Sequence, residues 1–182
     1  MKKVFLLLIT VCLLLFCASD AKADDFGSYK IDFPLSYSAP EIIDNSPTKL
    51  VLVMGQLRAD GSQSSMLINE IDISKFPPER QANIPEDPFK NFDDYLGTIR
   101  QRYVNFKRSE VTKVDVNGVL FARATWTGTI NHPEYGSFNM QGLVYIHRKG
   151  NMVYQINFMD YAQHANNSIE KAESAFKTFQ FK

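Results

Sequence analysis

Cysteine is scarce in this chain of 182 residues: it occurs twice, at Cys12 and Cys17, and both lie in an apolar N-terminal segment. The rest of the chain therefore has no thiol for a disulfide, a nucleophile or a cysteine-based metal site. Histidine occurs three times, at His132, His147 and His164, and none stands at metal-ligand spacing from another. The fold must be stabilised by a hydrophobic core, and the length suffices for one domain.

The sequence also lacks an excess of charge and lacks the common catalytic motifs. Lysine and arginine number 20, and aspartate and glutamate also number 20. A balanced surface exerts no long-range attraction on nucleic acid or anionic lipid. There is no glycine-rich phosphate loop, no G-x-S-x-G turn and no H-E-x-x-H helix. We therefore expect no catalytic residue, no cofactor and no nucleic-acid partner.

The first 23 residues have the layout of a secretory signal peptide. Lys2 and Lys3 precede an apolar run over residues 4–16, and Ala21-Lys22-Ala23 is a small-x-small cleavage site. We predict cleavage before Asp24, which leaves a single domain over residues 24–182 in the periplasm or outside the cell. Without the three basic residues and one acidic residue of the signal peptide, that domain has 17 basic and 19 acidic residues, a net charge of −2.

Cys17 supports an alternative, because a bacterial lipoprotein signal places a lipidated cysteine after a short apolar run. The preceding residue is Phe16, where that pattern requires a small residue. Cleavage after Ala23 fits the sequence better, and lipidation is the minor interpretation. Beyond residue 16 no stretch is apolar enough to span a bilayer, so no transmembrane segment is expected in the exported domain.

The segment from Ser109 to Tyr161 carries the clearest structural signal. Asn117-Gly118 and Gly150-Asn151 each separate two alternating runs rich in β-branched and aromatic residues. Such dipeptides between such runs are typical of two-residue β-hairpin turns. The segment is therefore predicted to form four consecutive antiparallel strands.

Three more strands are predicted before this segment. Residues 28–34 alternate as a first strand, and residues 50–58 and 66–73 are predicted to form a hairpin. Residues 35–48 are predicted to be a loop with one helical turn at 41–44.

Residues 74–88 contain four prolines and form a long connection. A connection of this length is either a functional contact or a solvated crossover between layers. Both interpretations are kept open.

Two helices are predicted, one before and one after the four strands. Residues 166–179 form an amphipathic C-terminal helix. Over residues 89–107, apolar side chains recur every three or four positions and form one stripe: Phe92, Tyr95, Leu96, Ile99, Tyr103 and Phe106. Such helices pack on a sheet, so the predicted class is α+β, an antiparallel sheet of about six to seven strands flanked by two main helices.

Alternation along the four strands predicts an apolar and a polar face of the sheet. Arg123, Thr125 and Thr127 are predicted to face away from Trp126. The next two strands are predicted to add polar residues to the same face: Asn139, Gln141, Tyr145, Gln155 and Asn157. An antiparallel sheet commonly exposes one face to water, so this band is either a solvated surface or a recognition surface.

The turn His132-Pro133-Glu134-Tyr135 is the nearest approach to a chemical constellation. A histidine and a carboxylate two residues apart can share a metal or move a proton. One histidine and one glutamate supply at most half of a tetrahedral site, and an ordinary turn is the simpler interpretation.

Taken in order, the elements resemble the PsbP/DcrB-like family. The resemblance is carried by Y-K-I-D-F-P, N-F-D-D-Y-L-G-T-I, V-N-G-V-L-F-A-R-A-T-W, G-N-M-V-Y-Q-I-N-F and S-A-F-K-T-F-Q-F, which span nearly all of residues 24–182. It implies a central antiparallel sheet between helices and an accessory or adaptor role, as in an extrinsic photosynthetic subunit, a nuclear-transport regulator or a toxin chaperone. No functional residue is carried over, and the metal binding of some plant members would need ligands that this sequence does not place.

Three functions follow as hypotheses. The first is a non-catalytic exported accessory or adaptor domain that binds another envelope or secreted protein through the polar face or the connection 74–88. The second is a small-ligand or metal carrier with its site near Trp126, His132 and Glu134. The third, a sub-case of the first, is an immunity protein or a chaperone for a secreted toxin.

Overall fold

The computed structural model describes residues 24–182; the predicted signal peptide, with Cys12 and Cys17, lies outside the described residues. The described chain forms one large antiparallel sheet of eight strands and a small sheet of three. The large sheet has the order β3-β4-β5-β10-β9-β8-β6, and β7 also pairs with β8. Its strands are β3 (Glu41–Asn45), β4 (Thr48–Met54), β5 (Ser65–Asp72), β6 (Val104–Arg108), β7 (Thr112–Val116), β8 (Val119–His132), β9 (Gly136–Lys149) and β10 (Met152–Tyr161).

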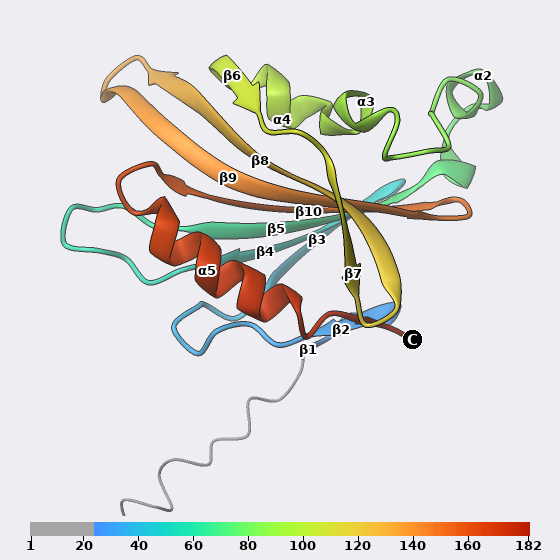
Figure 1. The fold of residues 1–182 in the computed structure, drawn as a ribbon, viewed down its shortest axis with the longest axis horizontal. Coiled ribbons are helices and arrows are strands. Elements are labelled where there is room, and N and C mark those ends of the chain that lie inside the picture. The colour runs from blue at the N-terminus through green and yellow to red at the C-terminus, as the bar shows by residue number, and fades with distance from the viewer. Residues whose placement is uncertain (1–23) are drawn as a thin grey trace, which may run out of the picture.

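Helices cover both faces of the large sheet (Figure 1). On the first, here named the α5 face, lie α5 (Ala165–Phe176) and the small sheet of β1 (Asp24–Asp25), β2 (Tyr29–Ile31) and β11 (Gln180–Phe181). On the second, here named the α3 face, lie the 3-10 turn η1 (Ile73–Lys75), α2 (Pro78–Gln81), α3 (Phe92–Leu96) and α4 (Thr98–Gln101). The predicted α+β class and the C-terminal helix are confirmed. No helix within residues 24–182 is long and apolar enough to cross a membrane.

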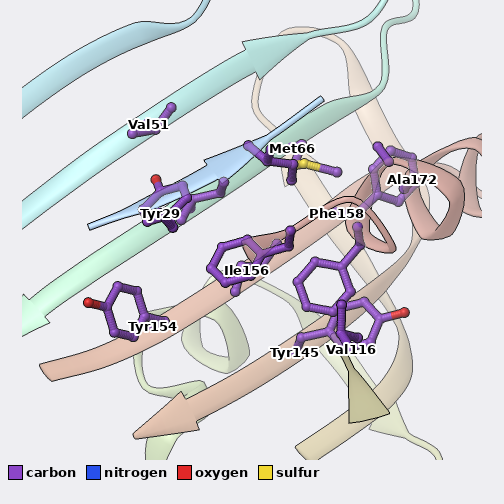
Figure 2. Packing of buried hydrophobic residues seen from close by; sticks show 14 of the residues in the cluster. Tyr29, Val51, Met66, Val116, Tyr145, Tyr154, Ile156, Phe158 and Ala172 are labelled. Carbon is purple, nitrogen blue, oxygen red and sulfur yellow. The ribbon is translucent and has the colours of Figure 1, made fainter. Parts of the chain in front are cut away.

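The core of the α5 face is rich in aromatic side chains, which pack among aliphatic ones (Figure 2). Tyr29 comes from the small sheet, is fully buried and lies beside Val51 of β4. Tyr145 stacks on Phe176 of α5 with 3.9 Å between ring centroids, and burial raises the pKa of Tyr145 to about 12. This packing fixes the small sheet and α5 on the main sheet.

The core of the α3 face is built around Trp126. Its ring lies 4.6 Å from that of Tyr103 and 5.7 Å from that of Phe106. Gly142, directly opposite Trp126 in β9, leaves the space that the indole ring fills.

The four strands predicted for residues 109–161 are confirmed as β7 to β10. Asn117 and Gly118 both have positive φ, 52° and 82°, which a two-residue turn of this hand requires. Gly150 likewise has a φ of 59° in the β9–β10 turn. Local turn chemistry therefore sets the register of these strands.

The long helix predicted over residues 89–107 is wrong. The chain forms two short helices, α3 and α4, which are separated by Gly97 with a φ of 43°, and then the strand β6. Glycine disfavours a continuous helix by about 1 kcal/mol, and residues 104–108 instead pair with the edge of β8. The apolar stripe nevertheless packs on the sheet as predicted, because Phe92, Leu96 and Ile99 are buried on the α3 face.

The helical turn predicted at residues 41–44 is also wrong. Residues 41–45 form the strand β3, which pairs with β4 across the turn at Ser46 and Pro47. Its five residues are all exposed, so no core pattern marked them as a strand.

The connection 74–88 runs across the edge of the α3 face through η1 and α2. The guanidinium of Arg148 in β9 donates to the carbonyl oxygens of Ile84 and Pro85 and so anchors the connection to the sheet. Ile84 packs against the α3-face core.

His147 lies half-buried at the margin of the α5-face core. Its ring is 5.2 Å from that of Phe121 and 5.3 Å from that of Phe181, and Nδ1 lies 2.9 Å from the Leu120 carbonyl oxygen. Burial lowers the pKa of His147, and the charge of Lys149 acts in the same direction.

Acidification is therefore expected to destabilise the protein through His147. Because its folded pKa lies below the unfolded value of about 6.5, the unfolded chain binds the proton first, and stability falls as the pH drops through about 6.5. Urea unfolding between about pH 7 and pH 5 should show a weaker pH dependence for His147→Gln than for the wild type. An equal dependence in both proteins would contradict this assignment.

Candidate functional site

Three connections meet at one end of the large sheet, on the left of Figure 1. They are the β4–β5 loop (55–64), the β8–β9 turn (133–135) and the β10–α5 connection (162–164). Together with the ends of the strands they border an open groove of about 1080 Å³. Aliphatic and aromatic side chains line it together with polar ones: Ile130, Phe138, Met140 and Tyr161, and Asp60, Asn139 and Gln163.

The β8–β9 turn presents an exposed aromatic side chain at this groove. His132 Nδ1 accepts hydrogen bonds from the backbone N–H groups of Glu134 (3.2 Å) and Tyr135 (3.3 Å). The Tyr135 ring packs on the His132 ring at 4.6 Å, yet Tyr135 is 70% exposed. His132 thus holds the turn, and Tyr135 is free to contact a partner.

A buried charge pair fixes the β4–β5 loop to the rest of this end. The Asp160 side chain, at the end of β10, has no exposed surface. Arg58 donates to both of its carboxylate oxygens, at 2.9 and 2.5 Å, and to the hydroxyls of Ser62 and Ser168. Hydrogen bonding to Asp160 raises the pKa of Arg58. The network joins the loop, β10 and α5.

A second contact ties the same loop to the start of α5. Asp60 accepts hydrogen bonds from Ser62 and from the Gln163 amide, and one oxygen lies 2.8 Å from His164 Nε2. The hydrogen bonds from Ser62, followed by that from His164, hold the pKa of Asp60 well below its usual range. Asp60 is therefore a charged acceptor on the rim of the groove.

The predicted single polar face is wrong, because its residues are divided between the two faces. Thr127 lies opposite Gln141 on the α5 face. Asn157 lies opposite Val144, and Gln155 lies opposite Ile146, so both belong to the α3 face. Residues directly opposite each other in a sheet point the same way.

Several predicted site residues are structural. Trp126 Nε1 donates to Asn157 Oδ1 at 2.9 Å inside the core, and the Gln155 amide donates to the Tyr95 carbonyl oxygen. Arg123 forms an ion pair of 2.5 Å with Glu173 of α5. Tyr145 is buried under α5.

Other predicted residues remain accessible at the surface. Thr127 and Asn139 are exposed, while Thr125 and Gln141 are half-buried. The groove brings three predicted residues together, namely His132, Tyr135 and Asn139. Trp126 lies six residues before His132 along β8, roughly 20 Å away, and does not line the groove, so the structure does not assemble a site from Trp126, His132 and Glu134.

Sequence reasoning missed the opposite wall of the groove. Asp60 lies in the loop of the hairpin predicted over residues 50–73, and its contact with His164 joins positions 104 residues apart. No local pattern signals such a contact. Phe138 and Tyr161 were likewise unmarked, although their rings pack edge to face at 5.5 Å.

Within residues 24–182, no group of three or more histidine, cysteine, aspartate or glutamate side chains is arranged to hold a metal ion. His132 and Glu134 lie in the same turn, but the ring nitrogen Nδ1 of His132 is used to accept the two backbone hydrogen bonds.

Comparison with solved structures defines the fold. The chain resembles cyanobacterial PsbP (CyanoP) from Synechocystis sp. PCC 6803 with a TM-score of 0.53 and 10% identity, over 91% of this chain and 95% of that one. It resembles LpqN of Mycobacterium tuberculosis with a TM-score of 0.51 and 13% identity, over 88% and 90% of the two chains. It resembles the Ran-binding protein Mog1p of Saccharomyces cerevisiae with a TM-score of 0.50 and 10% identity, over 88% and 94%.

These similarities confirm that the protein has a PsbP/Mog1-like α+β fold, as the resemblance in sequence predicted. No family model and no curated protein matches the sequence. At such low identity the likeness extends to the fold, and the function must be argued from the site.

Proposed function

We propose that this chain is a non-catalytic accessory protein, exported by the signal peptide 1–23 to the periplasm or the exterior, whose domain 24–182 binds another envelope or secreted protein. The observation that carries the proposal is Tyr135, an aromatic side chain 70% exposed beside an open groove. Tyrosine is enriched among residues that dominate binding energies, because one rigid ring buries a large area and carries a polar hydroxyl.

The composition of the groove supports a protein partner. Apolar side chains such as Phe138 and Tyr161 lie beside polar groups such as Asp60 and Gln163. Protein interfaces combine an apolar centre with a polar periphery in this way. The Arg58–Asp160 network holds one wall in place before binding, which reduces the entropy lost on association.

The structural neighbours support the same class of function. LpqN is described as involved in cell envelope biogenesis, and Mog1p is described as a Ran-binding protein. Both descriptions agree with an accessory, protein-binding use of this fold, and the first agrees with a site of action in the envelope.

Tyr135→Ser is expected to reduce capture of the partner by about tenfold or more, because loss of an interface tyrosine commonly costs about 2 kcal/mol. Its thermal midpoint should stay near that of the wild type, since Tyr135 is exposed. The measurement is a crosslinked pull-down from the native cell envelope, with partners identified and quantified by mass spectrometry.

Leu57→Ser is the matched control, because Leu57 is 63% exposed but does not line the groove. It should retain full capture. Equal capture by wild type and Tyr135→Ser would contradict the proposed surface. If the captured protein is a secreted toxin, the chain is an immunity protein or a toxin chaperone, which is one form of the same proposal.

A small-ligand carrier is the second candidate, because the groove volume of about 1080 Å³ is at the upper end of that of ligand pockets, roughly 300–1,000 Å³. A carrier should show a rise in thermal midpoint with an envelope metabolite extract, and Tyr135→Ser should abolish the rise. Because Trp126 lies away from the groove, its fluorescence is not expected to respond.

A further inference from the structure

The strand β3 is an edge strand of the large sheet. It lies at the end of the strand order, and among residues 24–182 it pairs with β4 alone. All five of its residues are exposed, including Ile42 at 54% and Ile43 at 37%. An exposed edge with apolar side chains is a template for another strand.

The backbone of β3 offers free hydrogen-bonding groups at defined positions. Residues of an antiparallel pair alternate between directing their backbone groups at the partner strand and away from it. The Ser38 N–H donates to the Met54 carbonyl oxygen, which shows that the even-numbered residues of β4 direct their backbone groups toward β3. In the β3–β4 register, the residues opposite them are the odd-numbered residues of β3. Ile42 and Asp44 therefore direct their N–H and C=O groups outward.

The side chains of this edge alternate in charge and hydrophobicity on both faces. Glu41 and Ile43 lie on the α3 face, and Ile42 and Asp44 lie on the α5 face. Within residues 24–182, neither Glu41 nor Asp44 takes part in an ion pair. Lys49, the cross-strand neighbour of Asp44, is held by Glu70 at 2.9 Å and by the Phe26 carbonyl oxygen.

A second copy of this chain does not complement the edge. Antiparallel pairing of β3 with itself must place outward-directed residues opposite each other, so a pair centred on Ile43 puts Ile42 opposite Asp44, and a pair centred on Ile42 puts Ile43 opposite Glu41. Because β3 contains no basic residue, neither register supplies a counter-charge to Glu41 or Asp44. The far edge of the sheet is split between β6 and β7, and β6 contains a register shift and a positive φ of 54° at Asn105. Neither strand has two apolar residues between two basic ones.

We infer that β3 binds an extended segment of a partner protein by strand addition, and that this segment has two apolar residues flanked by basic residues. A basic side chain then lies beside Glu41 and another beside Asp44, with apolar ones beside Ile42 and Ile43. The pattern basic-apolar-apolar-basic is the same in both chain directions, so it holds for parallel and antiparallel addition. The inference rests on the proposed function only in that the partner is a protein, and it adds a contact away from the groove.

The test is a titration of the isotope-labelled protein, expressed from its full sequence, with the peptide Thr-Lys-Val-Ile-Lys-Thr to about 1 mM, followed by NMR amide shifts. The expected result is saturable shifts at residues 41–45. The peptide Thr-Glu-Val-Ile-Glu-Thr should bind about tenfold more weakly or not at all. Absence of shifts at β3 with the lysine peptide would overturn the inference.

Two variants test the mechanism. Glu41→Lys combined with Asp44→Lys should exchange the preference, binding the glutamate peptide and losing the lysine peptide. Ile42→Pro removes one outward N–H without removing a β3–β4 hydrogen bond, so it should keep the fold and weaken binding about tenfold. An unchanged peptide preference in the charge variant would overturn the role of the carboxylates.

Two further readouts separate the possible failures. A wild-type dimer that the charge variant abolishes in analytical ultracentrifugation would assign the edge to a second copy and overturn the inference. Tyr135→Ser should bind the lysine peptide as the wild type does. If the lysine peptide fails to bind while Tyr135-dependent capture persists, the inference about β3 is wrong and the proposed function is supported. If the lysine peptide binds while capture does not depend on Tyr135, the groove is not the binding surface and the inference about β3 is supported.

Discussion

Replacing Asp160 with alanine is expected to lower the free energy of unfolding by about 3 kcal/mol. The Asp160 carboxylate is fully buried, while the Arg58 side chain that pairs with it is 26% exposed. Without Asp160, the partly exposed guanidinium of Arg58 loses its counter-charge and two hydrogen bonds, and Ser168 loses an acceptor. Removal of one partner of a buried pair costs more than the pair contributes. Urea unfolding followed by Trp126 fluorescence measures the change.

The double variant Asp160→Ala with Arg58→Met is the control for this prediction. It leaves no buried charge, so it should be more stable than Asp160→Ala alone. If the effects of the two substitutions on the free energy of unfolding are additive, then the uncompensated charge of Arg58 is not the cause of the lost stability. Because Arg58 also bonds to Ser62 at the groove, Asp160→Ala should in addition weaken partner capture at temperatures where the protein stays folded.

Gly142→Ala is expected to destabilise the fold by about 3 kcal/mol or more. A methyl group at this position would overlap the benzene ring of Trp126 and the carbonyl oxygen of Phe158. Trp126 cannot move away freely, because its ring is 1% exposed and packed against Tyr103 and Phe106. The overlap must be relieved by separating strands or by a strained rotamer. The thermal midpoint and the near-ultraviolet circular dichroism of Trp126 report both effects.

Gly61→Ala is the comparison for Gly142→Ala. A methyl group at Gly61 meets no atom within 4 Å, and its cost arises only from the positive φ of 78°. That cost should be about 1 kcal/mol, with no change in the Trp126 signal. A similar loss of stability in both variants would show that the overlap with Trp126 is not the cause of the destabilisation by Gly142→Ala.

The strands β7 to β10 follow from short-range signals in the sequence. Asn117, Gly118 and Gly150 adopt the positive φ values that their turns require. Alternation between these turns then predicts which residues of one strand share a face, and Arg123, Thr125 and Thr127 do lie on the face opposite to that of Trp126. Both signals act within about ten residues, so they can be recognised without knowledge of the rest of the chain.

The division of polar residues between the faces was within reach of the sequence but was assigned wrongly. The two-residue turn at Gly150 and Asn151 places Lys149 opposite Met152, and the same register places Val144 opposite Asn157. A shift of one residue moves every side chain to the other face. The register, rather than composition, buries Asn157 beside Trp126.

In the segment 89–107, apolar periodicity was not enough to predict the secondary structure. An apolar stripe at three- and four-residue spacing is compatible with one helix or with two short helices followed by a strand. Gly97 interrupts the helix, and pairing with β8, which lies later in the chain, turns residues 104–108 into β6. The stripe predicted burial correctly and secondary structure incorrectly.

Sequence patterns alone determined the α+β class, the four-stranded segment and the C-terminal helix, because turn chemistry and alternation are local. They also singled out His132, Tyr135 and Asn139, which the structure places at the groove. The tertiary structure decided the remainder. It brought Asp60 to His164, buried Asp160 against Arg58, and left β3 as an exposed edge. These features join segments as far as about a hundred residues apart, and such contacts depend on the packing of the whole sheet rather than on any local preference.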